Sequence, residues 1–429
     1  MLRPIAVDDS HPVRQLPPDP SLSDYLAVAA LENPGLKAAF HRWQAEVERT
    51  HFAGRLPDPR FSYTYYIEEV ETRVGPQRQS FALSQMLPWF GKLSLREKES
   101  TYAAEAAYAG FEAERLALFR RVAEAYWDYW YLGRSVESVR VDLELVKRLE
   151  SVIRVAYEAG EAGYSDLIRV QVEIGRLEDR LETLLDGRRP AMARLNAAMN
   201  RPPEAELPWP SDEPPAATEI SARTVHALAG DRNPELEALR RAVEKEQASV
   251  ELAGRNFYPD LTAGVTYIDT GGAVMPGVSD SGKDPVLAML SINVPLDRAK
   301  YRANEAAARR RHRAAARMLE ERRREIERRV EAALYDLRDA ARKAKLYAET
   351  LIPQARQALE AAEVAFRAGE AAFADLIDAQ RVWLEFELSF HESVARREKS
   401  LAALEELAAT QLRGRAGFGP PREEDSIPH

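Results

Sequence analysis

The sequence predicts a mainly α-helical chain that also carries transmembrane β-strands, built as two copies of a repeat containing a strand pair and a long helix. Three observations predict this fold class: an internal sequence repeat, four segments of alternating apolar and polar residues, and two long stretches rich in Ala, Glu, Arg and Leu. The 429 residues include no cysteine, which excludes disulfides and thiolate metal sites. The net charge of −9 argues against a dedicated nucleic-acid-binding protein.

The internal repeat is the strongest of these observations. Asn33-Pro34 recurs 200 residues later as Asn233-Pro234. Residues 157–171 recur 209 residues later as 366–380, with eight of fifteen positions identical. Ala/Glu-rich low complexity does not explain matched Gly, Pro, Asn and aromatic positions, so the chain is predicted to be a duplication.

The repeats predict the organisation of the chain. An irregular N-terminal arm (1–20) precedes the first repeat (21–200), and a Pro-rich connector (201–232) separates it from the second repeat (233–412). The prolines of the connector disfavour regular structure. Residues 413–429 are predicted to form a flexible tail.

Each repeat contains one predicted β-hairpin. Its strands cover about 60–71 and 78–87 in the first repeat, and about 261–269 and 285–294 in the second. Strands of about 9–11 alternating residues suit a tilted crossing of a lipid bilayer, although two hairpins of a soluble sheet would show the same alternation. Four strands cannot close a barrel, and lipid does not tolerate open sheet edges. Three chains with twelve strands are the simplest closed assembly.

A long helical hairpin follows each strand pair, at about 92–200 and about 298–412. Strong helix formers fill both segments, and antiparallel coiled coils are expected. Gly160 and Gly369 stand where left-handed residues would end the outgoing helices. Pro353 is predicted to kink the outgoing helix of the second repeat.

The remaining sequence features exclude several classes of site. The seven histidines show no metal-ligand spacing and no nucleophile–base arrangement is present, so neither an enzyme nor a cofactor site is expected. No run of about 18 apolar residues predicts a transmembrane helix. The N-terminal residues also lack the apolar core of a signal peptide. For an exported protein, we expect that the signal has been removed or lies upstream of Met1.

The ordered set of motifs resembles the TolC-type outer-membrane efflux factors over about residues 21–412. The shared features are the duplicated halves, the strand pair followed by Pro, the long helix and the pattern Gly-x-x-x-x-x-Asp-Leu-Ile. The segment 85–93 (QMLPWFGKL) is most similar to the branch that serves heavy-metal and small-molecule resistance pumps.

The resemblance implies a homotrimer in the bacterial outer membrane. It would form a twelve-stranded β-barrel in the lipid, joined to a periplasmic α-helical barrel. Such a trimer is a passive conduit for small molecules or metal ions. Its implied partners are a periplasmic adaptor protein, an inner-membrane pump of the RND type and outer-membrane lipid, with no nucleic acid.

The resemblance also implies roles for individual residues. Pro88 and Pro295 match the strand-to-helix corners, and the adjacent Trp89 and Phe90 suit the aromatic girdle of a membrane interface. The two hairpin tips match the surface on which the family's adaptor docks. The tip residues are Gly160, Glu161, Tyr164, Ser165, Gly369, Glu370 and Phe373.

Asp375 and Asp378 match the two aspartates that ring the tunnel entrance in the family. They lie three residues apart and share one helix face. Six carboxylates around a threefold axis would favour cation binding. The alternative is that the two aspartates only stabilise the N-terminus of their helix. In the first repeat Arg169 replaces the second acid, which leaves Asp166 and Arg169 as a candidate local pair.

One departure from the family pattern concerns the closed entrance. Well-studied members hold it with a Tyr and an Arg, and these positions are Phe366 and Ala371 in this chain. Two other functions stay open. The chain would also suit the channel of a type I protein secretion system. A non-membrane coiled-coil scaffold protein would explain the helices but not the two hairpins.

Overall fold

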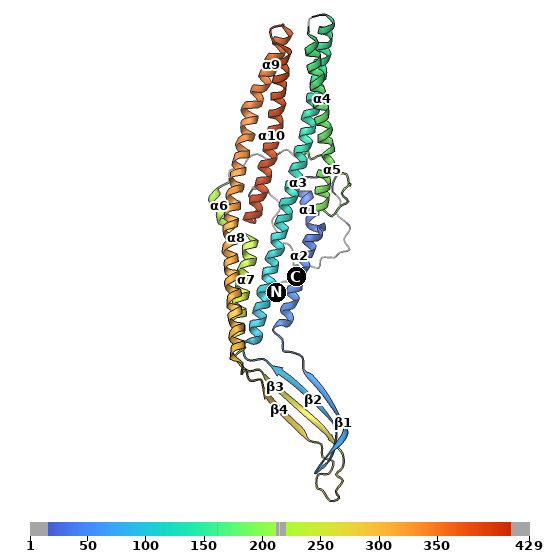
Figure 1. Cartoon of the computed structure of the whole chain (residues 1–429), viewed down its shortest axis with the longest axis vertical. Helices are drawn as coiled ribbons and strands as arrows, with labels where there is room; N and C mark the ends of the chain where they lie inside the picture. Colours follow the sequence, from blue (N-terminus) through green and yellow to red (C-terminus); the bar gives the residue numbers. More distant parts are fainter. Residues whose placement is uncertain (1–15, 161, 212–213, 215–219, 413–429) are drawn as a thin grey trace, which may run out of the picture. The chain divides into compact units, whose positions relative to one another are not determined.

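The computed structural model of the chain describes residues 16–160, 162–211, 214 and 220–412 (Figure 1). It is mainly helical with one four-stranded antiparallel sheet, which confirms the predicted fold class. The predicted tail (413–429) and most of the N-terminal arm lie outside the described residues.

The two halves of the chain follow the same order of two helices, two strands, an outgoing helix and a returning helix, although these last helices are interrupted at different places. The first half contains α1 (Leu22–Glu32), α2 (Pro34–Ala53), β1 (Arg60–Thr72), β2 (Gly75–Leu87), α3 (Lys92–Glu158), α4 (Tyr164–Asp186) and α5 (Arg188–Ala198). The second half contains α6 (Ala222–Arg232), α7 (Pro234–Arg255), β3 (Leu261–Thr270), β4 (Val286–Ile292), α8 (Arg298–Leu346), the π-helix η1 (Tyr347–Leu351), α9 (Ile352–Arg367) and α10 (Phe373–Ala408).

One predicted boundary is wrong. Helix α6 lies inside the predicted connector, 200 residues after α1, so the second repeat begins near Ser221 rather than at Asn233. The last proline of the connector is Pro215, and the Ala- and Leu-containing sequence after Ser221 is free to form a helix.

The strand bounds differ most from the predictions in β2 and β4. Strand β2 begins at Gly75, because φ of +132° there allows a tight turn from Thr72, whose hydroxyl donates to the Gly75 carbonyl (2.7 Å). Strand β4 is shorter than predicted, since it covers Val286–Ile292 only. The two hairpins are joined through β2 and β3, giving the sheet order β1-β2-β3-β4.

A π-helix stands where a kink was predicted. Pro353 lies in the first turn of α9, directly after η1. Equivalent buried residues before η1, such as Leu118 and Ile326, are 208 positions apart, whereas Gly160 and Gly369 after it are 209 apart. Because a π-turn holds one residue more than an α-turn, η1 accommodates the extra residue of the second copy.

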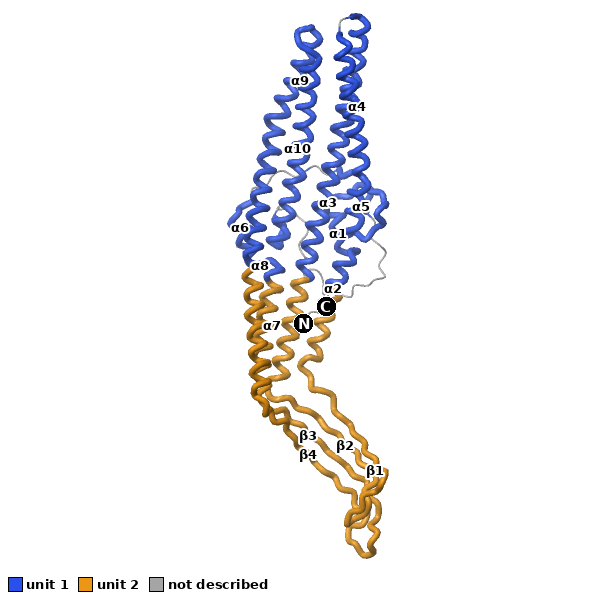
Figure 2. The backbone as a smooth tube through the Cα atoms, in the orientation of Figure 1, with its two compact units in different colours: residues 1–39, 111–236, 322–429 blue, residues 40–110, 237–321 orange. Residues whose placement is uncertain are grey.

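The chain divides into two compact units, which Figure 2 colours separately. Unit 1 comprises residues 1–39, 111–236 and 322–429, and unit 2 comprises 40–110 and 237–321. The sheet belongs to unit 2. Both large apolar clusters belong to unit 1.

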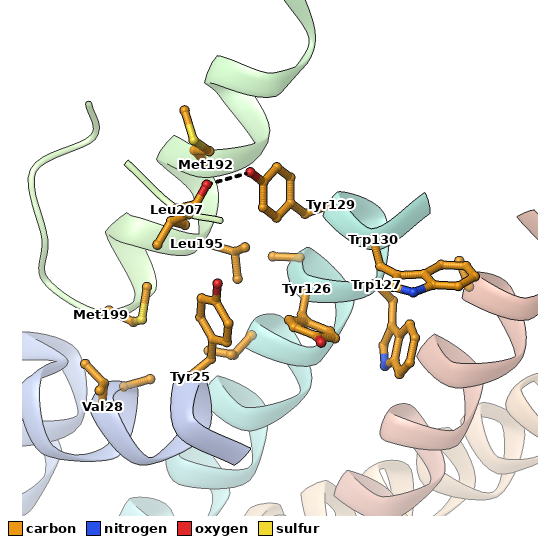
Figure 3. Close-up of a cluster of buried hydrophobic side chains, with 14 of the residues drawn as sticks. Tyr25, Val28, Tyr126, Trp127, Tyr129, Trp130, Met192, Leu195, Met199 and Leu207 are labelled. Atoms are coloured by element: carbon orange, nitrogen blue, oxygen red, sulfur yellow. Dashed lines mark hydrogen bonds between the residues drawn. The ribbon is translucent and has the colours of Figure 1, made fainter. Parts of the chain in front are cut away.

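The first apolar cluster surrounds the aromatic stretch of α3 (Figure 3). Tyr126 and Tyr129 are fully buried there, and Tyr25 of α1 packs edge-on against Tyr126 at 5.4 Å. The connector is irregular here as predicted, yet it is packed: Leu207 is buried, and its carbonyl accepts a hydrogen bond from the Tyr129 hydroxyl (3.0 Å).

Both copies use the same asparagine link between helices. The Asn33 amide donates to the Ala198 carbonyl (2.9 Å) at the end of α5, and the Asn233 amide donates to the Leu407 carbonyl (3.0 Å) at the end of α10. Each asparagine oxygen also accepts from the first turn of the helix that follows. The repeated Asn-Pro motif therefore caps one helix and holds the end of another.

Candidate functional site

The sheet has two chemically different faces. Cross-strand partners place Phe61, Leu83 and Val265 in one row, and Tyr63, Phe81 and Tyr267 in the next row of the same face. Directly paired residues point to the same side of a sheet, so this face is continuously apolar and aromatic. The opposite face carries small hydroxyl residues interspersed with apolar ones such as Ala82, Leu287 and Met289. The hydroxyl residues are Ser62, Thr64, Ser80, Ser84, Thr262, Thr266 and Ser291.

No apolar layer covers the apolar face in the described part of the chain. Phe61 is 65% exposed, Val265 53% and Leu290 73%, and all of β4 is exposed. In a soluble protein, other elements would cover such an apolar face. Exposed apolar patches of this extent mark an interaction surface. The faces suit a sheet with lipid on one side and water on the other.

The predicted corners and interface aromatics lie where the strands end. The backbone N–H of Trp89 donates to Asp260 (2.8 Å), and Lys92, almost fully buried, pairs with the same carboxylate (2.8 Å). The Trp89 ring stacks on Tyr258 at 5.4 Å, while Phe90 is 78% exposed. Pro88 lies between β2 and α3, and Pro295 lies between β4 and α8.

The two hairpin tips have the predicted turn geometry. Gly160 and Gly369 have φ of +78° and +73°, so the left-handed caps are confirmed. Equivalent aromatic pairs flank these glycines: the ring centroids of Tyr157 and Tyr164 lie 6.0 Å apart, and those of Phe366 and Phe373 lie 5.5 Å apart. Ser165, Gly369 and Glu370 are exposed, and Glu161 lies outside the described residues.

The equivalent tip aromatics differ in exposure. Tyr164 is 62% exposed, whereas Phe373 is 2% exposed. Phe373 is buried in the second apolar cluster, in which α10 packs against α3 and α4. Phe366, at a position where the family has its entrance lock, contributes to the same apolar packing.

Asp375 and Asp166 hold equivalent positions at helix starts. A carboxylate oxygen of Asp375 accepts from the Ala372 N–H (3.2 Å), and one of Asp166 accepts from the Gly163 N–H (3.4 Å). Both therefore stabilise a helix N-terminus. No ion pair joins Asp166 to Arg169 among the described residues.

Asp378 belongs to a charged chain that links the two copies. Arg381 lies 3.3 Å from Asp378 on α10, and its Nε donates to Glu173 of α4 (3.0 Å). Glu173 is 4% exposed. Asp378, the second acid of the predicted entrance, is thus ion-paired to Arg381, which also pairs with Glu173 of the first copy.

A second buried polar pair lies beside this chain. Gln380 of α10 donates a hydrogen bond through Nε2 to Asp142 of α3, and both side chains are 0% exposed. Burial raises the pKa of Asp142 to about 6; the Gln380 hydrogen bond opposes the rise, Glu173 adds to it and Arg180 opposes it. We define the contact of α10 with α3 and α4 as the hairpin seam.

Sequence reasoning did not single out these seam residues. Gln380 was visible as an identity with Gln171 in the repeat, but its partner is 238 positions away. A signal was present at Asp142, since an acid stands between Val139 and Val146 on a helix face that is otherwise apolar.

Other kinds of site are missing from the described part of the chain. Its residues form no group of three or more His, Asp or Glu side chains able to hold a metal ion. None of its helices is both long and apolar enough to span a membrane.

Comparison with solved structures shows the same fold. The chain matches a membrane protein from Pseudomonas aeruginosa with a TM-score of 0.77 and 20% identity, over 92% of this chain and 99% of that one. It matches VceC from Vibrio cholerae with a TM-score of 0.74 and 18% identity, over 91% and 97%. It matches the open state of MtrE from Neisseria gonorrhoeae with a TM-score of 0.73 and 19% identity, over 91% of this chain and 89% of that one.

Sequence comparison points the same way. A curated relative, Nodulation protein T of Rhizobium leguminosarum bv. viciae, is 24% identical over 172 residues, which is 37% of this chain and 36% of the relative. The chain therefore matches only about a third of that relative's length. The family model described as "Outer membrane efflux protein" matches residues 226–410, which is nearly all of the second repeat. The first repeat carries the same kinds of helix and strand in the same order. The second repeat thus matches the outer membrane efflux protein family, in agreement with the predicted resemblance to the TolC type.

Proposed function

We propose that the chain is the outer-membrane channel of a tripartite efflux system. The observation that carries this proposal is the sheet with one apolar and one hydroxyl-rich face, both exposed in the single chain. In a closed barrel the apolar face meets lipid and the hydroxyl face lines water. The channel performs no chemistry, and an inner-membrane pump supplies the energy.

The resemblance to the family and the exposed hairpin tips support a proposal for the partners and the cargo. The exposed tip residues are the proposed contacts of a periplasmic adaptor, with a pump of the RND type behind it. Small molecules or metal ions are the proposed cargo. The heavy-metal branch stays a prediction that rests on residues 85–93 alone.

Expression of the chain with a signal peptide, followed by fractionation of the cells, tests this function. We expect the protein in the outer membrane as a detergent-stable trimer. A water-soluble monomer would contradict the channel and favour the scaffold alternative. A neighbouring gene for a type I exporter would change the cargo to protein.

The duplication itself argues for assembly with further copies. At the hairpin seam, Phe373 and Ile377 of α10 are 2% and 3% exposed. Their equivalents in the first copy, Tyr164 and Ile168, are 62% and 39% exposed. This face of the second copy is thus covered within the chain, whereas the equivalent face of the first copy is exposed. In a ring, the exposed face of the first copy would meet the second hairpin of the next chain.

A specific pair of residues illustrates this ring. The seam within the chain contains the ion pair Glu173–Arg381. The equivalents are Val382 for Glu173 and Val172 for Arg381, and they are 42% and 54% exposed. Two unpaired apolar side chains therefore stand where the seam between chains would bring them together.

The double variant Val172→Cys with Val382→Cys tests this contact. The natural chain has no cysteine, so a short thiol cross-linker reacts only at the new positions. We expect covalent dimers and trimers on a denaturing gel. The matched variant Glu173→Cys with Arg381→Cys should cross-link within one chain and remain a monomer. If both variants stay monomeric, the proposed seam is wrong.

The acidic entrance gives a second prediction. In the channel, Asp375→Ala with Asp378→Ala removes six carboxylates around the axis, and divalent-cation block of single-channel current should weaken about tenfold or more. The single variant Asp166→Ala loses the equivalent helix cap and should keep the block. Unchanged block in the double variant would rule out an acidic gate at this position.

A further inference from the structure

The buried pair Asp142–Gln380 is incompletely hydrogen-bonded. Gln380 Nε2 donates to one carboxylate oxygen of Asp142, but Asp142 Oδ1 and Gln380 Oε1 are both buried without a partner. Two acceptor atoms on facing groups cannot bond to each other. An orphaned buried acceptor costs about 1–3 kcal/mol, so the arrangement calls for one more hydrogen.

We propose that the pair is a proton-operated latch of the hairpin seam. When Asp142 is neutral, its O–H donates to Gln380 Oε1 while the Gln380 amide donates to the other Asp142 oxygen, which holds α3 and α10 at two points. When Asp142 loses the proton, one hydrogen bond remains and the two orphaned oxygens repel. The proton goes to water and returns from water, and no other group is consumed.

The surrounding charges are compatible with such a latch. From α4, Glu173 and Arg180 act on Asp142 with opposite signs. From α10, Arg381 is paired with Glu173. Helix α9 contributes Leu359, Ala362 and Phe366 to this cluster, and these side chains carry no charge.

The sign of the pH dependence follows from the raised pKa of Asp142. The acid has its usual pKa of 3.8 when the seam is open and water reaches it, and about 6 in the closed seam. Neutral Asp142 is therefore favoured by closure. The closed seam has its full stability in acid and loses it as the pH rises through about 6. The ratio of closed to open seams should fall by up to about 100-fold between pH 4 and pH 8.

The second copy has no such group. The positions equivalent to Asp142 are Thr350 at an offset of 208 and Leu351 at 209, and neither titrates. Gln171, the equivalent of Gln380, is exposed. If three chains form the ring proposed above, only the three seams within chains respond to protons, and the seams between chains stay constant.

Paired spin labels can measure the latch directly. Val155 of α3 and Val364 of α9 are 67% and 68% exposed, and labels at Val155→Cys and Val364→Cys report the separation of the two hairpins. Labelled full-length chains are diluted with unlabelled chains, so that distances within one chain are recorded between pH 5 and pH 8. We expect a shift from a short to a longer distance with a midpoint near pH 6.

Three variants in the labelled background decide the assignment. Asp142→Asn should give the short distance at every pH, because two amides form both hydrogen bonds without a titratable proton. Gln380→Leu removes the hydrogen bond that opposes the rise in the pKa of Asp142, so the midpoint should move above pH 6. Gln171→Leu, the matched control in the first copy, should behave like the parent.

A pH-independent distance in the parent, or an unchanged midpoint in Asp142→Asn, would overturn the latch. An effect of Gln171→Leu equal to that of Gln380→Leu would do the same. Because the distances are measured within one chain, these results do not depend on whether the protein conducts.

Discussion

Val265→Arg is expected to deplete the assembled protein from the outer membrane. Val265 lies in the middle of β3 on the apolar face, between Leu83 and Ala288. An arginine facing lipid near the bilayer midplane costs about 2–4 kcal/mol, and each of three chains would carry one. The amount of detergent-stable trimer in purified outer membranes measures the effect.

The neighbouring residue provides a matched control. Thr266 is on the opposite face of the same strand, opposite Ala82 and Leu287. Thr266→Arg places the same charge toward water in the closed barrel, so trimer yield should stay near that of the parent. Equal loss in both variants would show that the two faces do not differ in environment, and the lipid assignment of the apolar face would fail.

Asn233→Ala is expected to lower the free energy of unfolding by about 2–4 kcal/mol. The side chain is 1% exposed, donates to the Leu407 carbonyl and accepts from the backbone N–H groups of Glu235 and Leu236. Its removal leaves buried backbone groups at the end of α10 and the start of α7 without partners, each at about 1–3 kcal/mol. Urea unfolding followed by circular dichroism measures the loss.

The equivalent asparagine of the first copy provides a comparison for this prediction. Asn33 makes the equivalent link to Ala198 but is only partly buried, so Asn33→Ala should cost less, about 1 kcal/mol. Asn304→Ala, at an exposed position of α8, should be nearly neutral. If Asn233→Ala matches Asn304→Ala in stability, the asparagine link does not hold the end of α10.

The predictions of fold class and family are confirmed because they used local signals that tertiary packing does not change. Glycine at Gly160 and Gly369 permits a positive φ that other residues resist, and this ends the outgoing helices in both copies. The boundary of the second repeat was missed for the opposite reason. Composition averages over a window, and the prolines before Ser221 concealed the capped helix that follows it.

The entrance shows where sequence reasoning stops. The resemblance to the family pointed to Asp375 and Asp378, but it did not give their partners in this chain. Asp375 bonds to a backbone N–H three residues away, and Asp378 bonds to Arg381, which reaches across to Glu173. The proposed acidic gate therefore has to act from residues that already have one partner each.

By itself, the sequence determined the duplicated order of elements, the alternating strands and the glycine caps, because each depends on neighbours along the chain. The tertiary structure alone decided that Phe373 is buried while Tyr164 is exposed, and that Asp142 meets Gln380. The physical reason is that similar sequences in the two copies have different surroundings. One copy's surface is covered within the chain, and the same surface of the other copy is left for another molecule.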